Sequence, residues 1–201
     1  IILDKSNKPE EALIAFKNGF KKDRNNSRIL AELVNNLSRI CSWDETNKYL
    51  ELIKKLNIKN ANFNPMMLMH LEDNLSLFYE SAINFYNENY HKKISNISPK
   101  SNYCNKEKIH IGYFSADFRA HPVMYLLSQI LQNHDKLKFK VFIYSFSNKE
   151  DNYTNELKKE PFIFRSIYNK NNVEALRIVS NDKLDIAIDL MGYTENQRMN
   201  L

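Results

Sequence analysis

Glycine is scarce in this sequence, with three residues among 201. A dinucleotide-binding turn of the form G-x-G-x-x-G and a P-loop both need several closely spaced glycines, because the backbone has to approach the phosphates closely. Neither pattern occurs in the sequence. We therefore do not expect this chain to carry the main binding site of a nucleotide.

Cysteine is rarer still, with Cys41 and Cys104 far apart and no second pair near either. A disulfide framework and a zinc site both require more cysteines at closer spacing, so we interpret the two as plain thiols. Asp185 and Asp189 are four residues apart on a strand-like run and do not form a D-x-D metal clamp. No His or Cys cluster has the spacing of metal ligands, and we expect no metal.

Long apolar runs and one-sided charge are also missing. No stretch approaches the roughly 18 apolar residues of a membrane span, and the start, IILDKSNKPEEA, lacks the layout of a signal peptide. We expect a cytoplasmic protein. The net charge is +5, but Lys and Arg exceed Asp and Glu by only 15 to 12 in residues 1–100 and by 14 to 12 in the remainder. Without a basic half, nucleic acid is not expected as a partner.

The composition is that of a globular protein. Hydrophobic residues make up 43% of the chain and charged residues 26%, which is enough for a sizeable core in one or two domains. The chain begins without Met and stops soon after a motif. We therefore expect it to be a fragment of something longer.

Residues 1 to about 60 have the pattern of amphipathic helices. In PEEALIAFKNGFKK, Pro9 suits a first helical turn, and apolar residues recur at i, i+3 and i+4. A second helix is expected after a cap at Asn26 or Ser27, and a third from Trp43. The expected apolar stripes of these two helices are Leu30, Leu33, Val34, Leu37 and Ile40, then Trp43, Leu50, Ile53 and Leu56.

These helices fit the register of a 34-residue helix-turn-helix repeat. Ala12 would be the small residue at the point of closest packing, and Thr46 stands at the same place in the next repeat. We expect tetratricopeptide-like (TPR-like) repeats over residues 1–60, and a helical bundle of another kind is the alternative.

One or two linker helices are expected in residues 61–100. The Met and aromatic residues of MMLMHLEDNLSLFYESAINFYNENY suit core packing, and His70 is interpreted as a packed or capping residue. The polar segment HKKISNISPKSNYCNKEK follows, and its Pro99 interrupts helical periodicity. We place a domain boundary near residue 100.

Residues 101–201 change to a pattern of alternating strands and helices. The runs IHIGYFS, FKVFIYSFS, FIFRSIY and LDIAIDLMG are typical of strands, and each intervening segment is long enough for a helix. Crossovers of this length predict a parallel sheet covered on both faces. The expected fold is therefore an α-helical TPR-like region followed by a Rossmann-like α/β lobe, which is half of a doubly wound domain.

Two polar segments follow strands of this predicted sheet. SADFRAHP follows the first strand and MGYTENQR follows the fourth. Ligands of open parallel sheets bind beyond the carboxyl ends of the strands, where loops converge and helix N-termini offer free N–H groups. We expect the two segments to emerge at the same edge and to form the functional site.

The same segments carry a resemblance to a known family. IHIGYFSADFRAHPVMYLL, FKVFIYSFS and DIAIDLMGYTENQR resemble, in order, the amino-terminal catalytic lobe of the O-linked N-acetylglucosamine transferase and SPINDLY family. CSWDETNKYLELIKKL is similar to the end of that family's tetratricopeptide array. The resemblance implies a GT-B fold, in which two Rossmann-like lobes face each other and the second holds most of a nucleotide sugar.

The resemblance also implies roles for residues of the first segment. His121 matches a histidine that points into the family's cleft and is proposed there as general base, a role that suits an imidazole near neutral pH. Asp117 and Arg119 would orient the loop or the ring, Ser115 would cap the following helix, and Pro122 belongs to the same motif. The alternative is that His121 only caps the helix and Asp117 only closes an Asx turn.

The second segment matches the family at Gly192, Tyr193, Thr194 and Arg198. Gly192 would permit a tight exit from the strand, and the Thr194 hydroxyl would contact the sugar or the acceptor. Arg198 is expected either to bind substrate or to act as a structural clamp on the loop.

The function that this resemblance implies is transfer of N-acetylglucosamine from UDP-GlcNAc to Ser or Thr of proteins, with inversion and without a metal or other cofactor. The helical repeats would present acceptor proteins. One alternative is a TPR scaffold or binding protein with a degenerate transferase lobe, and another is a protein glucosyl- or fucosyltransferase. A second α/β half after Leu201 would favour an enzyme, whereas without one the chain would be inactive alone.

Overall fold

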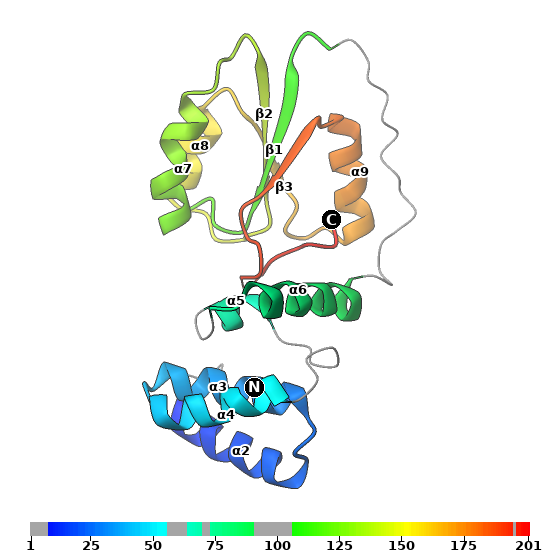
Figure 1. The fold of residues 1–201 in the computed structure, drawn as a ribbon. Coiled ribbons are helices and arrows are strands. Elements are labelled where there is room, and N and C mark those ends of the chain that lie inside the picture. The colour runs from blue at the N-terminus through cyan, green and yellow to red at the C-terminus, as the bar shows by residue number, and fades with distance from the viewer. Residues whose placement is uncertain (1–7, 56–63, 70–72, 91–105, 195) are drawn as a thin grey trace. The chain divides into compact units, whose positions relative to one another are not determined.

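A computed structural model describes residues 8–55, 64–69, 73–90, 106–194 and 196–201. The chain divides into two compact units, Ile1–Lys92 and Lys93–Leu201, and each is treated by itself. The first unit is helical and the second combines strands and helices (Figure 1). No helix among these described residues is both long and apolar enough to span a bilayer.

The helical unit contains the helices that the sequence predicts. Their bounds are α2 (Pro9–Lys22), α3 (Ser27–Arg39), α4 (Trp43–Lys55), α5 (Pro65–Met69) and α6 (Leu75–Asn89). Asn26 is the N-cap of α3, because its side-chain oxygen accepts the N–H of Ile29 at 3.1 Å. Asn74 caps α6 in the same way.

The core of this unit confirms most of the predicted apolar stripes. The buried stripe residues are Leu30, Leu33, Val34 and Leu37 of α3 and Leu50 and Ile53 of α4. Ile40 and Trp43 depart from the prediction, with 41% and 55% of their surfaces exposed. They lie where α3 ends and α4 begins, so the chain turns away from the packed face at this point.

The two small positions of the proposed repeat are both buried. Ala12 and Thr46 are each 1% exposed, and the Thr46 hydroxyl donates to the carbonyl of Ser42 at 2.8 Å. This bond satisfies a polar group that would otherwise be costly to bury. The TPR-like repeat itself stays a prediction. Several sequence expectations lie outside the described residues, namely those for Leu56, His70, Pro99, Cys104 and the boundary near residue 100.

The second unit follows the predicted order of strands and helices. Its elements are β1 (Ile109–Ser115), α7 (Pro122–Gln132), β2 (Phe139–Ser145), α8 (Asn152–Lys159), β3 (Ile163–Ser166), α9 (Asn172–Asp182) and β4 (Ile186–Asp189). All strand pairs are parallel, in the order β3-β2-β1-β4. Because β1 lies between β2 and β4, the chain following β1 lies between the ends of its two neighbours.

Helices cover both faces of this sheet, as the sequence predicts. Helices α7 and α8 lie on one face and α9 lies on the other (Figure 1). Ile111, Tyr113 and Ile143 pack with α7 and α8, whereas Phe142 and Tyr144 pack with α9. Successive residues of a strand point to opposite faces, so the continuous apolar runs of β1 and β2 supply both layers of the core.

Candidate functional site

The segments after β1 and β4 are in contact at one edge of the sheet. These strands are parallel neighbours, with Phe114 opposite Asp189, so both chains leave the sheet at its carboxyl edge. Met191 joins them, because its Sδ lies 3.3 Å from both the Ser115 hydroxyl and the Ala116 N–H, and each donates to it. The expectation that the two polar segments share an edge is therefore confirmed.

Ser115 stabilises the backbone of the first segment. Its side chain is completely buried, and its Oγ accepts the N–H of Asp117 at 2.9 Å. Ser115 does not cap α7, since that position belongs to His121. We therefore assign Ser115 to the support of the loop rather than to helix capping or to substrate contact.

Asp117 and Arg119 hold each other within the loop. The Arg119 guanidinium donates to Asp117 Oδ1 at 2.9 Å, and the Arg119 N–H donates to the Asp117 carbonyl at 2.8 Å. The second carboxylate oxygen, Oδ2, lies 3.8 Å from Nδ1 of His121. This arrangement is the one expected of residues that orient the loop.

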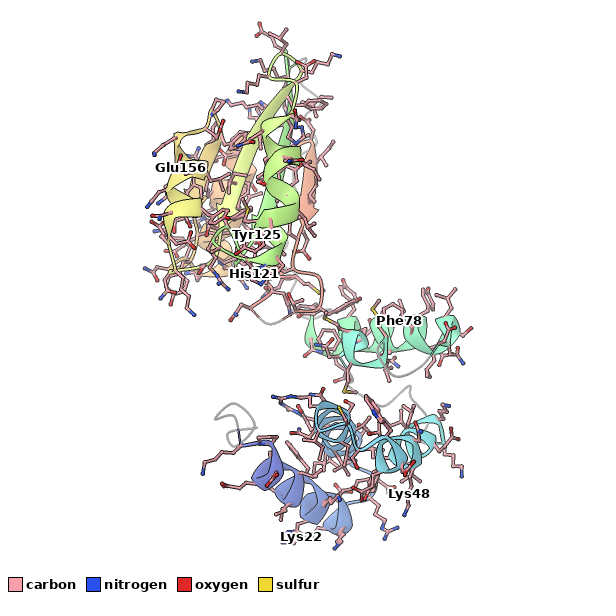
Figure 2. All side chains as sticks on the ribbon, turned by 90° about the vertical axis from the view of Figure 1, so that its left-hand side faces the viewer. Lys22, Lys48, Phe78, His121, Tyr125 and Glu156 are labelled. Carbon is pink, nitrogen blue, oxygen red and sulfur yellow. The ribbon has the colours of Figure 1, made fainter. Side chains whose placement is uncertain are left out.

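His121 lies at the rim, at the start of α7 (Figure 2). It is the N-cap residue, and its Nδ1 accepts the N–H of Val123 at 3.3 Å. Pro122 follows in the first helical turn, where its missing N–H costs nothing. About a third of the His121 side chain is exposed, so the ring both caps the helix and reaches solvent.

The cap determines which ring nitrogen carries the proton. While Nδ1 accepts the N–H of Val123, it has no proton of its own, so a neutral ring carries its proton on Nε2. In this tautomer Nε2 donates a hydrogen bond. A lone pair on Nε2 requires the proton to move to Nδ1, where the nearest carboxylate is that of Asp117.

The second segment begins with a tight turn after β4. Asp189 accepts the N–H groups of Met191 and Gly192, both at 3.0 Å, through its two carboxylate oxygens. Gly192 has a φ of 53°, which favours glycine. The Thr194 hydroxyl donates to the Met191 carbonyl at 2.7 Å, so its proton is engaged while its lone pairs can still accept. Tyr193 is half-buried in the same turn.

Arg198 has the contacts of the structural clamp that the sequence allowed. Its guanidinium donates to the Ile167 carbonyl at 2.9 Å, to the Lys170 carbonyl at 3.1 Å and to Asn172 Oδ1 at 2.6 Å. Burial lowers the pKa of this guanidinium. The contacts fix the chain after β4 to the segment between β3 and α9.

Sequence reasoning missed four residues that shape this edge: Met191, Asp189, Asp151 and Thr154. Asp151 and Thr154 belong to the N-terminus of α8, where the sequence indicated only a segment long enough for a helix. They carry a capping box and also contact the loop before His121. The usual signal of a capping box is Ser, Thr, Asp or Asn followed three residues later by Glu or Gln, and here that later residue is Thr, so the sequence signals the Asp151 cap alone. Nothing in the sequence signals the contacts to the loop.

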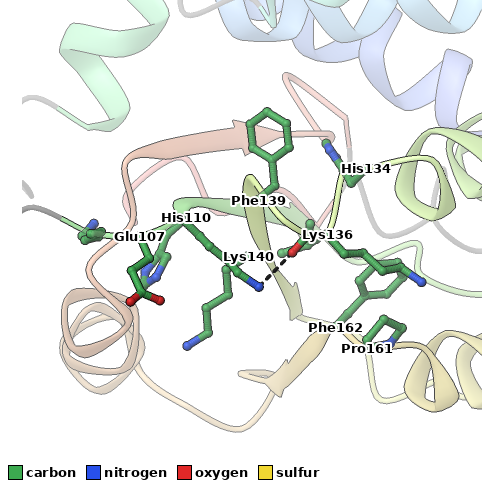
Figure 3. Close-up of a pocket in the computed structure, with 11 residues that line it drawn as sticks. Glu107, His110, His134, Lys136, Phe139, Lys140, Pro161 and Phe162 are labelled. Atoms are coloured by element: carbon green, nitrogen blue, oxygen red, sulfur yellow. Dashed lines mark hydrogen bonds between the residues drawn. The ribbon is translucent and has the colours of Figure 1, made fainter.

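A pocket of about 490 Å³ lies at the opposite, amino edge of the same sheet (Figure 3). Two of its four lysines are partnered by the chain itself, because Lys108 Nζ donates to the Lys136 carbonyl at 2.8 Å and Lys106 Nζ ion-pairs with Asp185. His134 bonds to the hydroxyl of Tyr113 through Nε2 at 2.8 Å. Helix C-termini gather at this edge, and cations stabilise them. We interpret the pocket as part of the scaffold.

No group of three or more His, Cys, Asp or Glu residues within the part of the chain that the structure describes is placed to share a metal ion. At the carboxyl edge, the groups available for chemistry are the imidazole of His121 and the polar groups of the turn after β4. These groups can bind and orient a polar substrate and can move a proton.

Three comparisons with known proteins agree with this picture. The Arabidopsis thaliana protein "Probable UDP-N-acetylglucosamine--peptide N-acetylglucosaminyltransferase SPINDLY" is 34% identical over 95 residues, which are 45% of this chain and 10% of that protein. A Caenorhabditis elegans UDP-N-acetylglucosamine--peptide N-acetylglucosaminyltransferase is 32% identical over 96 residues, which are 47% of this chain and 8% of that protein. The chain thus spans about a tenth of these relatives.

A solved structure extends the likeness to the fold of most of the chain. A mutant O-GlcNAc transferase of Thermobaculum terrenum aligns with 90% of this chain at a TM-score of 0.63, with 18% sequence identity and 36% of its own chain covered. The sequence profile of glycosyl transferase family 41 matches residues 84–201, which include every element of the α/β unit. The matched residues are more than half of this chain, and the chain therefore belongs to glycosyl transferase family 41.

Proposed function

We propose that this chain forms part of an inverting glycosyltransferase that moves N-acetylglucosamine from UDP-N-acetylglucosamine to Ser or Thr hydroxyls of proteins. The observation that carries the proposal is the contact of the two motif segments at the carboxyl edge of β1 and β4, with a partly exposed His121 at the same rim. Relatives named as peptide N-acetylglucosaminyltransferases support the choice of donor and acceptor.

His121 is the proposed general base for the acceptor hydroxyl. Attack of that oxygen on the anomeric carbon forms the new glycosidic bond and breaks the bond to the UDP phosphate, and the hydroxyl proton passes to Nε2. For this step the ring proton has to reside on Nδ1, so the bond from Val123 gives way to a bond from Nδ1–H to Asp117. The 3.8 Å separation has to shorten by about 1 Å for that bond to form.

The other groups of the rim then have supporting tasks. The Thr194 hydroxyl oxygen accepts from a sugar or acceptor hydroxyl, and Gly192 and Tyr193 shape the adjoining turn. We propose that Pro122 and Asp117 keep the His121 ring at the rim. We propose transfer without a metal: His121 takes the hydroxyl proton, and the charge on the departing UDP phosphate would be stabilised by the second lobe that holds the nucleotide.

The proposal includes the setting of the reaction. The helical unit, as TPR-like repeats, would present acceptor proteins to the transferase lobes. The nucleotide sugar would be held mostly by a second lobe, since the α/β unit has no glycine-rich phosphate loop. The reaction would take place in the cytoplasm, where nucleotide sugars and acceptor proteins meet.

The proposal is tested by assaying the full-length gene product with UDP-N-acetylglucosamine, UDP-glucose and GDP-fucose. Intact-protein mass spectrometry of acceptor proteins reads the mass added per transfer. We expect addition of N-acetylhexosamine from the first donor only. Transfer of glucose or fucose would instead identify a related transferase of the same fold, and no transfer from any donor would identify a scaffold or binding protein.

A further inference from the structure

The loop that carries His121 is fastened to the N-terminus of α8 at two points. The Ala120 N–H donates to Asp151 Oδ2 at 2.6 Å, and the Thr154 hydroxyl donates to the Phe118 carbonyl at 2.6 Å. These bonds join segments more than 30 residues apart in the sequence, which follow the adjacent strands β1 and β2. We call this pair of bonds the clasp.

The two clasp bonds are made to the backbone of the loop directly before His121. Ala120 is the neighbour of His121, and Phe118 is anchored by a ring that is 2% exposed. The backbone between these two points is therefore fixed at both ends. His121 begins where the clasp ends, so its Cα position depends on Asp151 and Thr154.

The two clasp residues are themselves held rigidly. Asp151 Oδ1 accepts the Thr154 N–H at 3.1 Å, and the Asp151 N–H donates to Thr154 Oγ1 at 3.3 Å, which completes a capping box. Thr154 is 1% exposed. The N–H of Ala120 is the leading cause of a lowered pKa at Asp151, so its carboxylate is charged at neutral pH.

We propose that Asp151 and Thr154 are positioning residues for the transfer reaction, holding His121 at the rim through the backbone of Phe118 and Ala120. This inference rests on the proposed function of His121. Neither residue touches a reacting atom in this scheme. Their effect is on geometry, and a displacement of about 1 Å can cost a reaction about a hundredfold in rate.

Asp151→Asn removes the clasp bond to Ala120 and keeps the cap bond to Thr154. Asparagine caps helices as well as aspartate does, because one side-chain oxygen suffices for the Thr154 N–H. Its second group is an amide NH₂, which cannot accept from Ala120. Asn171→Ser is the matched control, since Asn171 caps α9 with the same kind of capping box and serine preserves the cap.

Thr154 offers an independent pair of variants. Thr154→Ser keeps the hydroxyl that reaches Phe118, whereas Thr154→Val keeps the shape and removes the hydroxyl. If the hydroxyl matters, the serine variant retains function and the valine variant does not. A role in packing alone predicts the reverse order.

The experiment measures two properties of each variant. Amide hydrogen exchange of Ala120 in the 201-residue chain reports the clasp without any reaction, and kcat and KM for UDP-N-acetylglucosamine are measured on the full-length protein. For Asp151→Asn and Thr154→Val we expect at least tenfold faster exchange at Ala120, at least tenfold lower kcat and a KM within about twofold. Asn171→Ser and Thr154→Ser should match the wild type within about twofold.

The outcomes separate this inference from the function on which it rests. A wild-type kcat in Asp151→Asn and Thr154→Val, while a His121 variant is inactive, overturns the positioning role and leaves the proposed function standing. Unchanged exchange at Ala120 overturns the clasp itself. A wild-type protein that transfers no sugar overturns the proposed function and the positioning role together.

Discussion

At the scale of single residues, His121 joins two tasks in one side chain. It caps α7 through Nδ1, and about a third of its side chain is exposed at the rim. The sequence suggested both tasks as competing interpretations, and the structure shows the cap. Because a capping residue is fixed relative to its helix, the cap holds the imidazole in a defined place before the reaction, and the proposed proton transfer then exchanges this bond for one to Asp117.

Gly192 is a residue where the backbone alone sets the requirement. An added Cβ would meet no atom within 4 Å, so the cost of Gly192→Ala is conformational and comes from the φ of 53°. We expect the variant to lower the unfolding free energy of the α/β unit by about 1 kcal/mol. Urea denaturation followed by the NMR amide signals of β1 measures this change.

Gly19→Ala is the control for Gly192→Ala, because Gly19 lies inside α2. The Cβ there meets only the Ile29 side chain, at 3.3 Å from Cδ1 and 3.6 Å from Cγ2, and a shift of a few tenths of an ångström at Cδ1 accommodates it. Alanine favours a helix over glycine by about 1 kcal/mol, so this variant should stabilise the helical unit. A loss of stability in Gly19→Ala, or none in Gly192→Ala, would contradict the backbone argument.

At the scale of secondary-structure elements, the local sequence predicted most of what is seen. Both α2 and β1 have the bounds that their patterns indicated, since Pro9 marks a helix start and the run IHIGYFS is rich in isoleucine and aromatic residues. Ile40 and Trp43 are exposed because Ile40 is the C-cap residue of α3 and Trp43 is the first residue of α4, where the apolar stripe no longer faces the core. The clasp and the contacts of Met191 escaped prediction because they join distant segments and have no local pattern.

Three elements of the α/β unit are tied by a buried carboxylate. Asp182 of α9 accepts the Tyr144 hydroxyl of β2 at 2.8 Å and the Arg165 guanidinium of β3 at 2.9 Å. Burial, then this hydrogen bond, raises the pKa of Tyr144 well above its ordinary value of 10.0. The folded state therefore favours the neutral phenol more strongly than the unfolded state does.

Tyr144→Phe should cost about 1 to 2 kcal/mol at pH 7, because a buried bond to a charged acceptor is lost. The raised pKa of Tyr144 adds to the free energy of unfolding, and this addition is complete below pH 10 and is lost as the pH rises above 10. The difference between wild type and variant should therefore shrink above pH 10. Chemical denaturation at pH 7 to 11 measures it.

Tyr168→Phe provides the control for this series, since Tyr168 is 46% exposed. We expect its effect to stay within about 0.5 kcal/mol at pH 7. A Tyr144→Phe effect that grows as the pH rises above 10 would refute the role assigned to the bond between Tyr144 and Asp182.

At the scale of the whole molecule, charge at the edges of the sheet makes folding of the α/β unit sensitive to acid. The pKa of Asp185 lies below its ordinary value of 3.8, chiefly through its hydrogen bond from Lys106 and then through the His110 N–H. The pKa values of Asp135 and Asp151 are lowered as well, each chiefly by a backbone N–H. These carboxylates stabilise the fold above pH 3.8, and their contributions vanish as the pH falls through the lowered values.

Asp185→Asn tests this charge effect. The wild type should be more stable than the variant at pH 7, and the difference should diminish once the pH falls below 3.8. Urea midpoints of the α/β unit between pH 7 and pH 2 measure the difference. If the difference in urea midpoint between wild type and variant stays constant over this range, the ionised form of Asp185 contributes nothing to stability.

For the whole chain, the sequence predicted the family and the position of the site but not the donor sugar. Two short motifs were enough to indicate the family and the shared edge, and both are confirmed. Local patterns in these 201 residues do not select the donor sugar, because in the proposed function the residues that recognise it would belong to a second lobe. The chain spans about a tenth of the length of relatives such as the Arabidopsis protein.

The central claim is that His121 acts chemically at the rim in addition to capping α7. The most direct measurement compares kcat and the melting temperature of the full-length protein with those of His121→Asn and His121→Ala. Asparagine is a strong helix cap and has no basic nitrogen, so we expect His121→Asn to keep the melting temperature and to lose at least a hundredfold in kcat. His121→Ala should lose both stability and activity. A His121→Asn variant with wild-type kcat would contradict the claim and leave the histidine as a cap alone.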